Sequence, residues 1–329
     1  MTTSAAATPS HTEASSIAHR MIARMIRVPP SYYVFVVLLA IIWIHKPNQI
    51  DVKIMGIFFR DVAPLGIVVL GQLVVMRARS IDLSGAGVIL LVNYYFASGI
   101  FESPVAVVAT IGILTGLVVG MVNGLLIGLR RSSAVLVTLA VNTILIGIVR
   151  HLAGGKPPGA IPDVMNEIYR TGFLSVPTPV ILWVGLTLVM SMFLSQFVYG
   201  RYVSAVGANP IAARFSGVPV ERTVVVAHMI SGLMAGIAAV VQASSVKVGS
   251  IRFGLDLPLD AVAATILGGV VFGKGEGGVR GPFFGVLSFA LLFVVLRNFE
   301  VPEAGRWVAR GLIILLAAGI YGIRTATKS

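Results

Sequence analysis

Ten apolar runs, separated by short segments rich in Gly, Pro and charged residues, make up most of the chain. They lie at 32–44, 61–76, 83–101, 104–129, 133–152, 177–198, 223–243, 258–272, 282–299 and 303–323. A helix needs about 20 apolar residues to cross a bilayer, and most of the runs approach this length. With 57% hydrophobic and 12% charged residues, the chain also has too little polar surface for a water-soluble globule. The sequence therefore predicts an all-α polytopic membrane protein with about ten transmembrane helices.

Several runs, notably 61–76 and 258–272, fall short of this length. We expect them to be extended at their ends or paired with broken, re-entrant backbone, because lipid cannot satisfy exposed backbone groups. In each half of the chain a polar motif, a short run and a glycine-stepped run follow in the same order. With five spans in each half, the sequence predicts two weakly related halves, the second inverted relative to the first.

Glycines recur every four residues in the run 104–129, at Gly116, Gly120, Gly124 and Gly128. This spacing places all four on one helix face, and a face without side chains lets a neighbouring helix approach to backbone contact. We therefore predict helix packing at these positions. A shorter series opens the ninth run, at Gly277, Gly281 and Gly285.

The two ends of the chain differ from the apolar runs. Residues 1–16 are rich in Ala, Ser and Thr and cannot bury enough surface to fold, and three arginines follow at helical spacing. We predict a disordered and amphipathic tail over 1–30, a transmembrane domain over 31–323 and a short tail over 324–329. Basic residues favour the cytoplasmic side, and their distribution predicts that both tails and the loop 199–222 are cytoplasmic.

No motif in the sequence supports a catalytic or metal site. The chain has no cysteine, its five histidines are scattered, and no Ser lies in a nucleophile elbow. A glycine-rich stretch is spelled like a phosphate-binding or dinucleotide-binding loop, GGVVFGKGEGG at 268–278. Gly275 stands where the first motif needs Ser or Thr, and neither motif has a strand-to-helix context here. We expect no catalytic residue, no metal and no bound cofactor, and since basic loops account for the net charge of +12, no nucleic-acid partner.

The segment 198–223 is the longest polar, basic and glycine-punctuated interruption of the apolar pattern. Its small residues, together with Pro210 and Pro219, predict short helical pieces that are joined by turns and exposed to water. A hydrophilic loop between two spans must be basic on the cytoplasmic side in any case. The alternative is that a partner outside the membrane contacts this segment.

Polar side chains within the apolar runs are candidates for a solute path or gate: Asp82, Ser84, Asn93, Asn123, Asn142 and Asp260. An ionised carboxylate beside an apolar stretch is costly unless it faces water, a partner or the amino-terminal amides of a helix. Asp82 can also cap the helix that follows it. The asparagines, like His228 and Gln242, can instead hydrogen-bond between helices. Both interpretations stay open.

Four stretches resemble the permease subunits of ribose-type and related monosaccharide ABC importers. They are SIDLSGAG at 80–87, GRYVSAVGANPIAARFSGVPVER at 200–222, LDAVAATILGGVVFGKGEGGVRG at 259–281 and RGLIILLA at 310–317. The resemblance covers 60–323 in motif order and spacing. The chain departs from the family at Arg79 and Ser80, where a second Gly usually precedes the Ile-Asp pair.

The resemblance implies a permease of the bacterial inner membrane that pairs with a second copy or a paralogue. Such a permease receives a monosaccharide or sugar-like solute from a periplasmic binding protein, and separate ATPase subunits that hold ATP and Mg drive it. The resemblance also implies that the loop between the sixth and seventh spans couples the permease to the ATPase. The residues that match this loop are Gly200, Arg201, Gly207, Asn209, Ala212, Ala213, Arg214, Ser216 and Gly217.

Two other functions remain open. An ion-coupled secondary transporter would use Asp82 or Asp260 as an ion site, but the long polar loop would then have no evident task. A membrane-embedded enzyme would need a catalytic cluster near an interface, and the sequence contains none.

Overall fold

The computed structural model describes residues 28–173, 176–252 and 254–326, and most of these residues are helical. The only strands in these ranges are β1 (Gly172–Phe173) and β2 (Val176–Pro177), which pair antiparallel in a two-stranded hairpin. The predicted amino-terminal tail lies almost wholly outside the described residues, and the last helix extends to Ala326.

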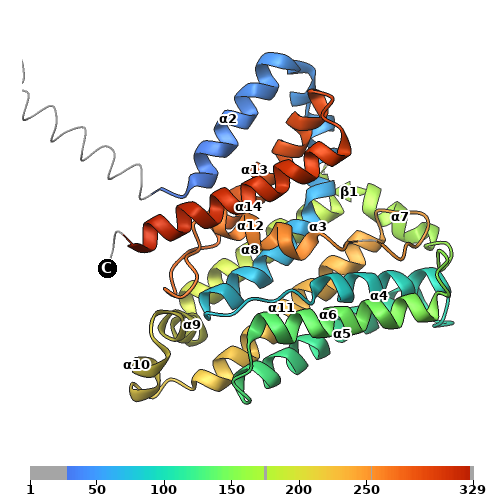
Figure 1. The fold of residues 1–329 in the computed structure, drawn as a ribbon. Helices are drawn as coiled ribbons and strands as arrows, with labels where there is room; N and C mark the ends of the chain where they lie inside the picture. The colour runs from blue at the N-terminus through green and yellow to red at the C-terminus, as the bar shows by residue number, and fades with distance from the viewer. Residues whose placement is uncertain (1–27, 174–175, 253, 327–329) are drawn as a thin grey trace, which may run out of the picture.

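Each of the ten apolar runs overlaps a helix, although α12 ends at Leu267, before the end of the run 258–272 (Figure 1). In chain order these helices are α2 (Pro30–His45), α3 (Val52–Arg77), α4 (Gly85–Ser98), α5 (Val105–Gly128), α6 (Ala134–Leu152), α8 (Thr178–Gln196), α11 (Val220–Ala243), α12 (Leu257–Leu267), α13 (Arg280–Asn298) and α14 (Glu303–Ala326). Shorter elements join them: η1 (Pro47–Ile50), α7 (Asp163–Arg170), α9 (Val198–Ala208) and α10 (Pro210–Phe215).

Six helices among the described residues are long and apolar enough to cross a membrane: α3, α5, α6, α8, α11 and α13. Three further apolar helices, α2, α4 and α12, are shorter. The structure therefore agrees with an all-α polytopic membrane protein. The run 61–76 is extended as expected, because α3 begins at Val52 after Asp51, whose side chain accepts a hydrogen bond from the Lys53 amide.

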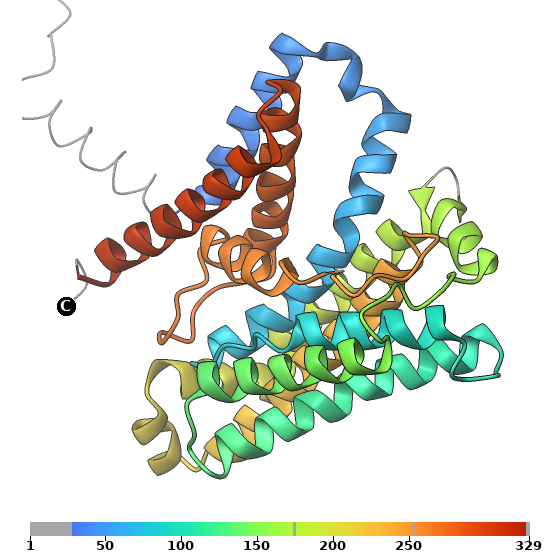
Figure 2. The same cartoon turned by 45° about the vertical axis from the view of Figure 1, so that its right-hand side comes forward.

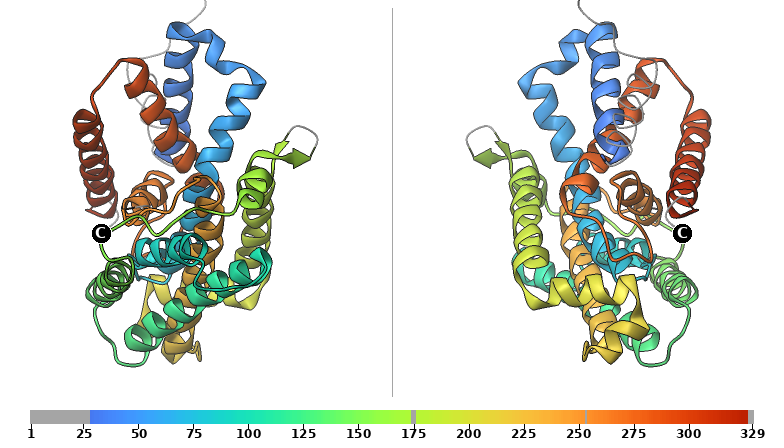
Figure 3. Two further views of the ribbon diagram at one scale, coloured as in Figure 1. Left: turned by 90° about the vertical axis from the view of Figure 1, so that its right-hand side faces the viewer. Right: turned by 90° about the vertical axis from the view of Figure 1, so that its left-hand side faces the viewer.

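Helix α11 occupies the centre of the molecule and packs against α5, α3 and α4. Figures 1 and 2 show α4, α5, α6 and α11 together in one group of helices, while α2, α13 and the first half of α3 form a second group. Helix α12 lies between these groups and packs against α13 and α3, as the side views in Figure 3 also show. The largest apolar core joins residues of both groups, with fully buried side chains such as Ile67, Trp183 and Phe289.

The glycine face of α5 lies directly against α11. A Cβ atom added at Gly116 would lie 2.8 Å from the Cα atom of Gly236, and one at Gly124 would lie 2.7 Å from the Cα atom of Val225. Gly120 and Gly128 face the α11 backbone in the same way. Since real Cβ atoms do not approach other backbones this closely, only glycine allows this separation of the two helices.

Two short helices form the polar segment between α8 and α11, and Asn209 separates them. The Asn209 side chain caps α10, because its oxygen accepts hydrogen bonds from the amides of Ile211 and Ala212. A small apolar cluster of Val206, Ala213 and Val220 packs α10 back onto α9 and α11. The sequence pattern of short helical pieces joined by turns therefore corresponds to a packed helical unit.

Candidate functional site

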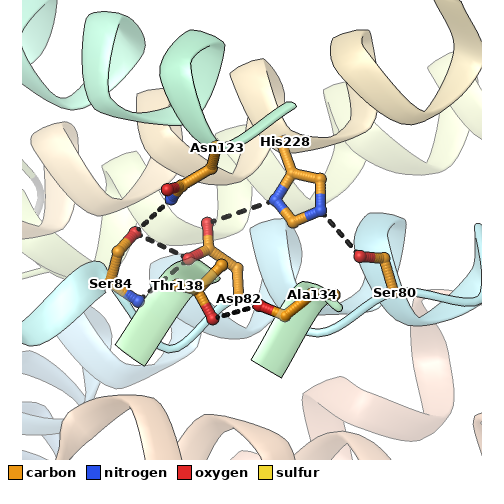
Figure 4. Close-up of polar contacts among 7 residues, drawn as sticks. All are labelled: Ser80, Asp82, Ser84, Asn123, Ala134, Thr138 and His228. Atoms are coloured by element: carbon orange, nitrogen blue, oxygen red, sulfur yellow. Dashed lines mark hydrogen bonds and ion pairs between the residues drawn. The ribbon is translucent and has the colours of Figure 1, made fainter. Parts of the chain in front are cut away.

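A buried polar cluster surrounds Asp82, in the irregular segment between α3 and α4 (Figure 4). Asp82 is 5% exposed, and its Oδ1 atom accepts hydrogen bonds from the Ser84 amide at 2.9 Å and the Ser84 hydroxyl at 2.6 Å. The Asn123 side-chain amide on α5 donates to the Ser84 hydroxyl at 2.8 Å. His228 on α11 lies with Nδ1 3.9 Å from Asp82 Oδ2 and Nε2 2.7 Å from the Ser80 hydroxyl.

This cluster connects three parts of the chain that are far apart in sequence. It joins the segment 78–84 to α5 through Asn123 and to α11 through His228. Asp82 is not the N-cap residue of α4, which is Ser84, but Asp82 accepts the Ser84 amide and so orders the turn before the helix. These hydrogen bonds therefore hold the segment between α3 and α4 in place against α5 and α11.

The structure brings Asp82, Ser84 and Asn123 together but places the other two asparagines elsewhere. Asn142 on α6 accepts a hydrogen bond from the Gly87 amide at 2.7 Å, next to the start of α4. Asn93 on α4 accepts one from the Ser250 amide at 3.0 Å, in the connection between α11 and α12. Both side chains bind backbone of a neighbouring segment, as expected for polar residues between membrane helices.

Asp260 lies in a different environment from Asp82. It is buried in the first turn of α12 and lines a cavity of 470 Å³ between α2, α3, α12 and α13. Its other polar lining residues include Gln242 and Arg297, and three phenylalanines share the wall: Phe58, Phe289 and Phe293. Aromatic faces combined with carboxylate, amide and guanidinium groups can hold a small polar solute.

The polar unit α9–α10 exposes large apolar side chains that lie outside the motif residues of this loop. Phe215 is 89% exposed and Ile211 is 70% exposed on α10. Of the selected residues, Ala213 is buried against α9 and α11, whereas Gly217 is exposed in a left-handed turn with φ of 80° and no atom near its missing Cβ. A residue that contacts a partner must be accessible, which favours Phe215 and Ile211 over Ala213.

The unit α9–α10 also rests on the ends of two other elements. A Cβ atom added at Gly207 would lie 2.6 Å from the Cα atom of Gly275, in the loop between α12 and α13. The Arg77 guanidinium at the end of α3 donates a hydrogen bond to the Ser204 hydroxyl. The Tyr199 hydroxyl donates to the Thr223 carbonyl at 2.8 Å, and burial raises the pKa of Tyr199, so this donor stays protonated.

Within the described part of the chain, no group of three or more His, Asp or Glu side chains is placed to hold a metal ion. The glycine-rich stretch 268–278 forms the loop between α12 and α13, with left-handed glycines at 269, 273, 275 and 277. This loop packs against α9 at Gly275, and it follows the helix α12 rather than a strand.

The chain is similar over most of its length to known membrane permeases. The chain is 26% identical to the ribose import permease protein RbsC of Haemophilus influenzae over 292 residues, which cover 87% of this chain and 90% of that protein. It is 29% identical to the L-arabinose transport system permease protein AraH of Escherichia coli over 264 residues, covering 74% and 80%. It is 30% identical to RbsC of Bacillus subtilis over 285 residues, covering 85% and 88%. No solved structure matches the chain.

One family model matches residues 54–318 of the chain. This region contains the segment before α4, the short helix α12 and the unit α9–α10. That model describes the permease component of branched-chain amino acid transport systems. Since the match spans most of the chain, the protein belongs to this family of membrane permease components.

Proposed function

We propose that the chain is the transmembrane permease subunit of an ATP-driven importer for a monosaccharide or a sugar-like solute. The observation that carries this proposal is the similarity over most of the chain to ribose and arabinose permeases. A periplasmic binding protein delivers the solute, separate cytoplasmic ATPase subunits supply the energy, and a second permease copy or paralogue completes the membrane unit. Both chain ends face the cytoplasm.

Helix order supports the proposal of ten spans in two inverted halves. From α3 to α6 the chain forms a long helix, an irregular segment, the short helix α4 and two further helices. From α11 to α14 the same order recurs, with α12 as the short helix. Transporters built from inverted repeats place solute sites at such broken helices, because the freed backbone groups can line a polar cavity.

The solute path, on this proposal, includes the cavity beside Asp260. Its volume of 470 Å³ is within the range of ligand sites, and its aromatic and polar lining suits a neutral polyhydroxyl compound. The Asp82 cluster is buried, and its hydrogen bonds join the turn before α4 to α5, so we assign it to positioning α4 along the path rather than to direct contact with the solute.

The exposed end of α10 is the contact with the ATPase in this proposal. Large apolar side chains on a short helix can anchor in a groove of a partner, and Phe215 and Ile211 are the exposed large side chains there. The packing of α9 against Gly275 and Arg77 supplies a rigid link from this contact to the ends of α12 and α3.

The test is solute uptake into vesicles that contain the purified chain with and without its ATPase, with solute-loaded binding protein outside. We expect uptake only when the ATPase and ATP are both present. Uptake that needs no ATPase and collapses when ion gradients are dissipated would refute the proposal and identify a secondary transporter.

A further inference from the structure

A groove rich in arginine lies beside α10. Its volume is 410 Å³, and it is lined by the end of α3, the end of α5, α10 and the start of α11. Its charged residues are Arg79, Arg131, Arg214 and Glu221. We call this feature the arginine groove.

The arginine groove has an excess of positive charge. Arg214 donates a hydrogen bond to Glu221, and Arg131 lies 3.9 Å from the same carboxylate. Within the part of the chain that the structure describes, no carboxylate lies within ion-pair distance of Arg79, which is exposed. The groove therefore holds three arginines and one glutamate, and it can accept further negative charge.

Two of these arginines adopt a backbone conformation that favours glycine. Arg79 has φ of 63° just after α3, and Arg131 has φ of 54° just after α5. The amide that follows each of them bonds back to a helix carbonyl: Ser80 to Val75 at 2.8 Å and Ser132 to Leu126 at 3.4 Å. Helices commonly end this way with glycine, because a Cβ atom strains the left-handed conformation.

Positive charge on a cytoplasmic loop does not by itself require these positions. Arg130, next to Arg131, supplies the same charge to the same loop from a residue that is not left-handed and does not line the groove. Strained backbone persists where a site requires a side chain in a particular place. Among the described residues, the third non-glycine residue with positive φ, Glu300 after α13, lies outside the groove, whereas both strained arginines line it. Their shared placement points to a binding function.

We propose that the arginine groove binds an acidic side-chain cluster of the ATPase subunit, as a second contact beside α10. This proposal rests on the proposed function. Arginine holds carboxylates in a two-point geometry, and the apolar side chains of Ile211 and Phe215 are exposed on α10, whose Pro210 and Arg214 line the groove. Charged and apolar contacts side by side fit a protein surface, whereas a free phosphate would leave the apolar side chains of α10 in water.

The experiment compares binding of the ATPase to the wild-type chain and to four variants in detergent, at several salt concentrations. The variants are Arg79→Gly, Arg131→Gly, the double variant and the control Arg130→Ala. We expect the double variant to bind the ATPase at least about tenfold more weakly, with a shallower dependence on salt, because it lacks two charge-assisted contacts. The control should stay within about twofold of wild type.

The melting temperature of each variant distinguishes a loss of ATPase binding from a loss of folded structure. Glycine relieves the left-handed strain, so Arg79→Gly and Arg131→Gly should melt no lower than wild type while they bind the ATPase less well. Equal ATPase binding by the double variant and Arg130→Ala would overturn the proposal. The proposal would also be overturned if the double variant bound the ATPase normally but no longer bound anionic-lipid vesicles. The same holds if its only loss were the thermal shift that inorganic phosphate causes in the wild type. A wild-type chain that binds no ATPase at all would refute the proposed function itself.

Discussion

Replacing Gly120 with alanine adds one methyl group where α5 and α11 meet backbone to backbone. The new Cβ atom would lie 3.1 Å from the Cα atom of Gly232 and closer still to the His228 carbonyl oxygen. Carbon atoms pack best at about 3.5–4.0 Å, so the two central helices must separate or shift. Overpacking of this kind costs about 1–3 kcal/mol.

Gly147 on α6 provides the matched control. It is exposed, and no heavy atom lies within 4 Å of an added Cβ atom. The gain in helix propensity from Gly to Ala, about 1 kcal/mol, applies at both positions and cancels in the comparison. Gly120→Ala should therefore be less stable than Gly147→Ala by about 1–3 kcal/mol, and Gly120→Leu should lower the yield of folded protein.

The assay is thermal unfolding of the purified chain in one detergent, followed by size-exclusion chromatography after heating. Both variants should retain the wild-type solute preference, because neither glycine lines the cavity beside Asp260. A Gly120→Ala protein that melts at or above the temperature of Gly147→Ala would show that α5 and α11 do not meet at this point.

Three further predictions concern transport. Phe215→Ser should keep the wild-type melting temperature, since Phe215 is 89% exposed, but should lose the ATP hydrolysis that loaded binding protein stimulates. Ala213→Leu should instead lower the melting temperature, because Ala213 is buried. The opposite pattern would contradict this assignment of α10. Asp82→Asn should transport better than Asp82→Ala, because Asn retains an acceptor for the Ser84 amide, and equal uptake per inserted protein in both would remove that hydrogen bond from the mechanism. Asp260→Ala should reduce uptake with normal expression, and wild-type uptake would exclude the cavity from the path.

Much of the helix pattern could be predicted from hydropathy alone. The run 104–129 became α5, Val105–Gly128, because Pro104 and the arginines after Gly128 define both ends. The start of α3 could not be found in this way. Its first turns carry Lys53, Arg60 and Asp61, and a search for continuous apolar residues ends at such charges although the backbone stays helical.

The candidate site was only partly predictable. Asp82, Ser84 and Asn123 each stood out as polar residues in apolar runs, but their grouping depends on the packing of the segment 78–84 against α5, across 39 positions of sequence. The contact of Ser80 with His228 on α11 spans 148 positions, and neither contact obeys a spacing rule. His228 could be expected only as a hydrogen-bonding residue between helices, and Ser80 showed no separate signal. Similarly, the exposure of Phe215 depends on how α10 folds back onto α9.

The glycine-rich stretch 268–278 has a physical explanation that its resemblance to nucleotide-binding motifs obscured. Gly275 has φ of 66°, and a Cβ atom there would lie 3.0 Å from the Ala208 amide and closer still to the Ser204 carbonyl oxygen. Gly207 faces the same point from α9. Glycine is therefore required on both sides of one backbone contact, between the unit that carries Phe215 and the loop that leads from α12. On the proposed function, this contact and α12 connect the unit that binds the ATPase to the cavity beside Asp260.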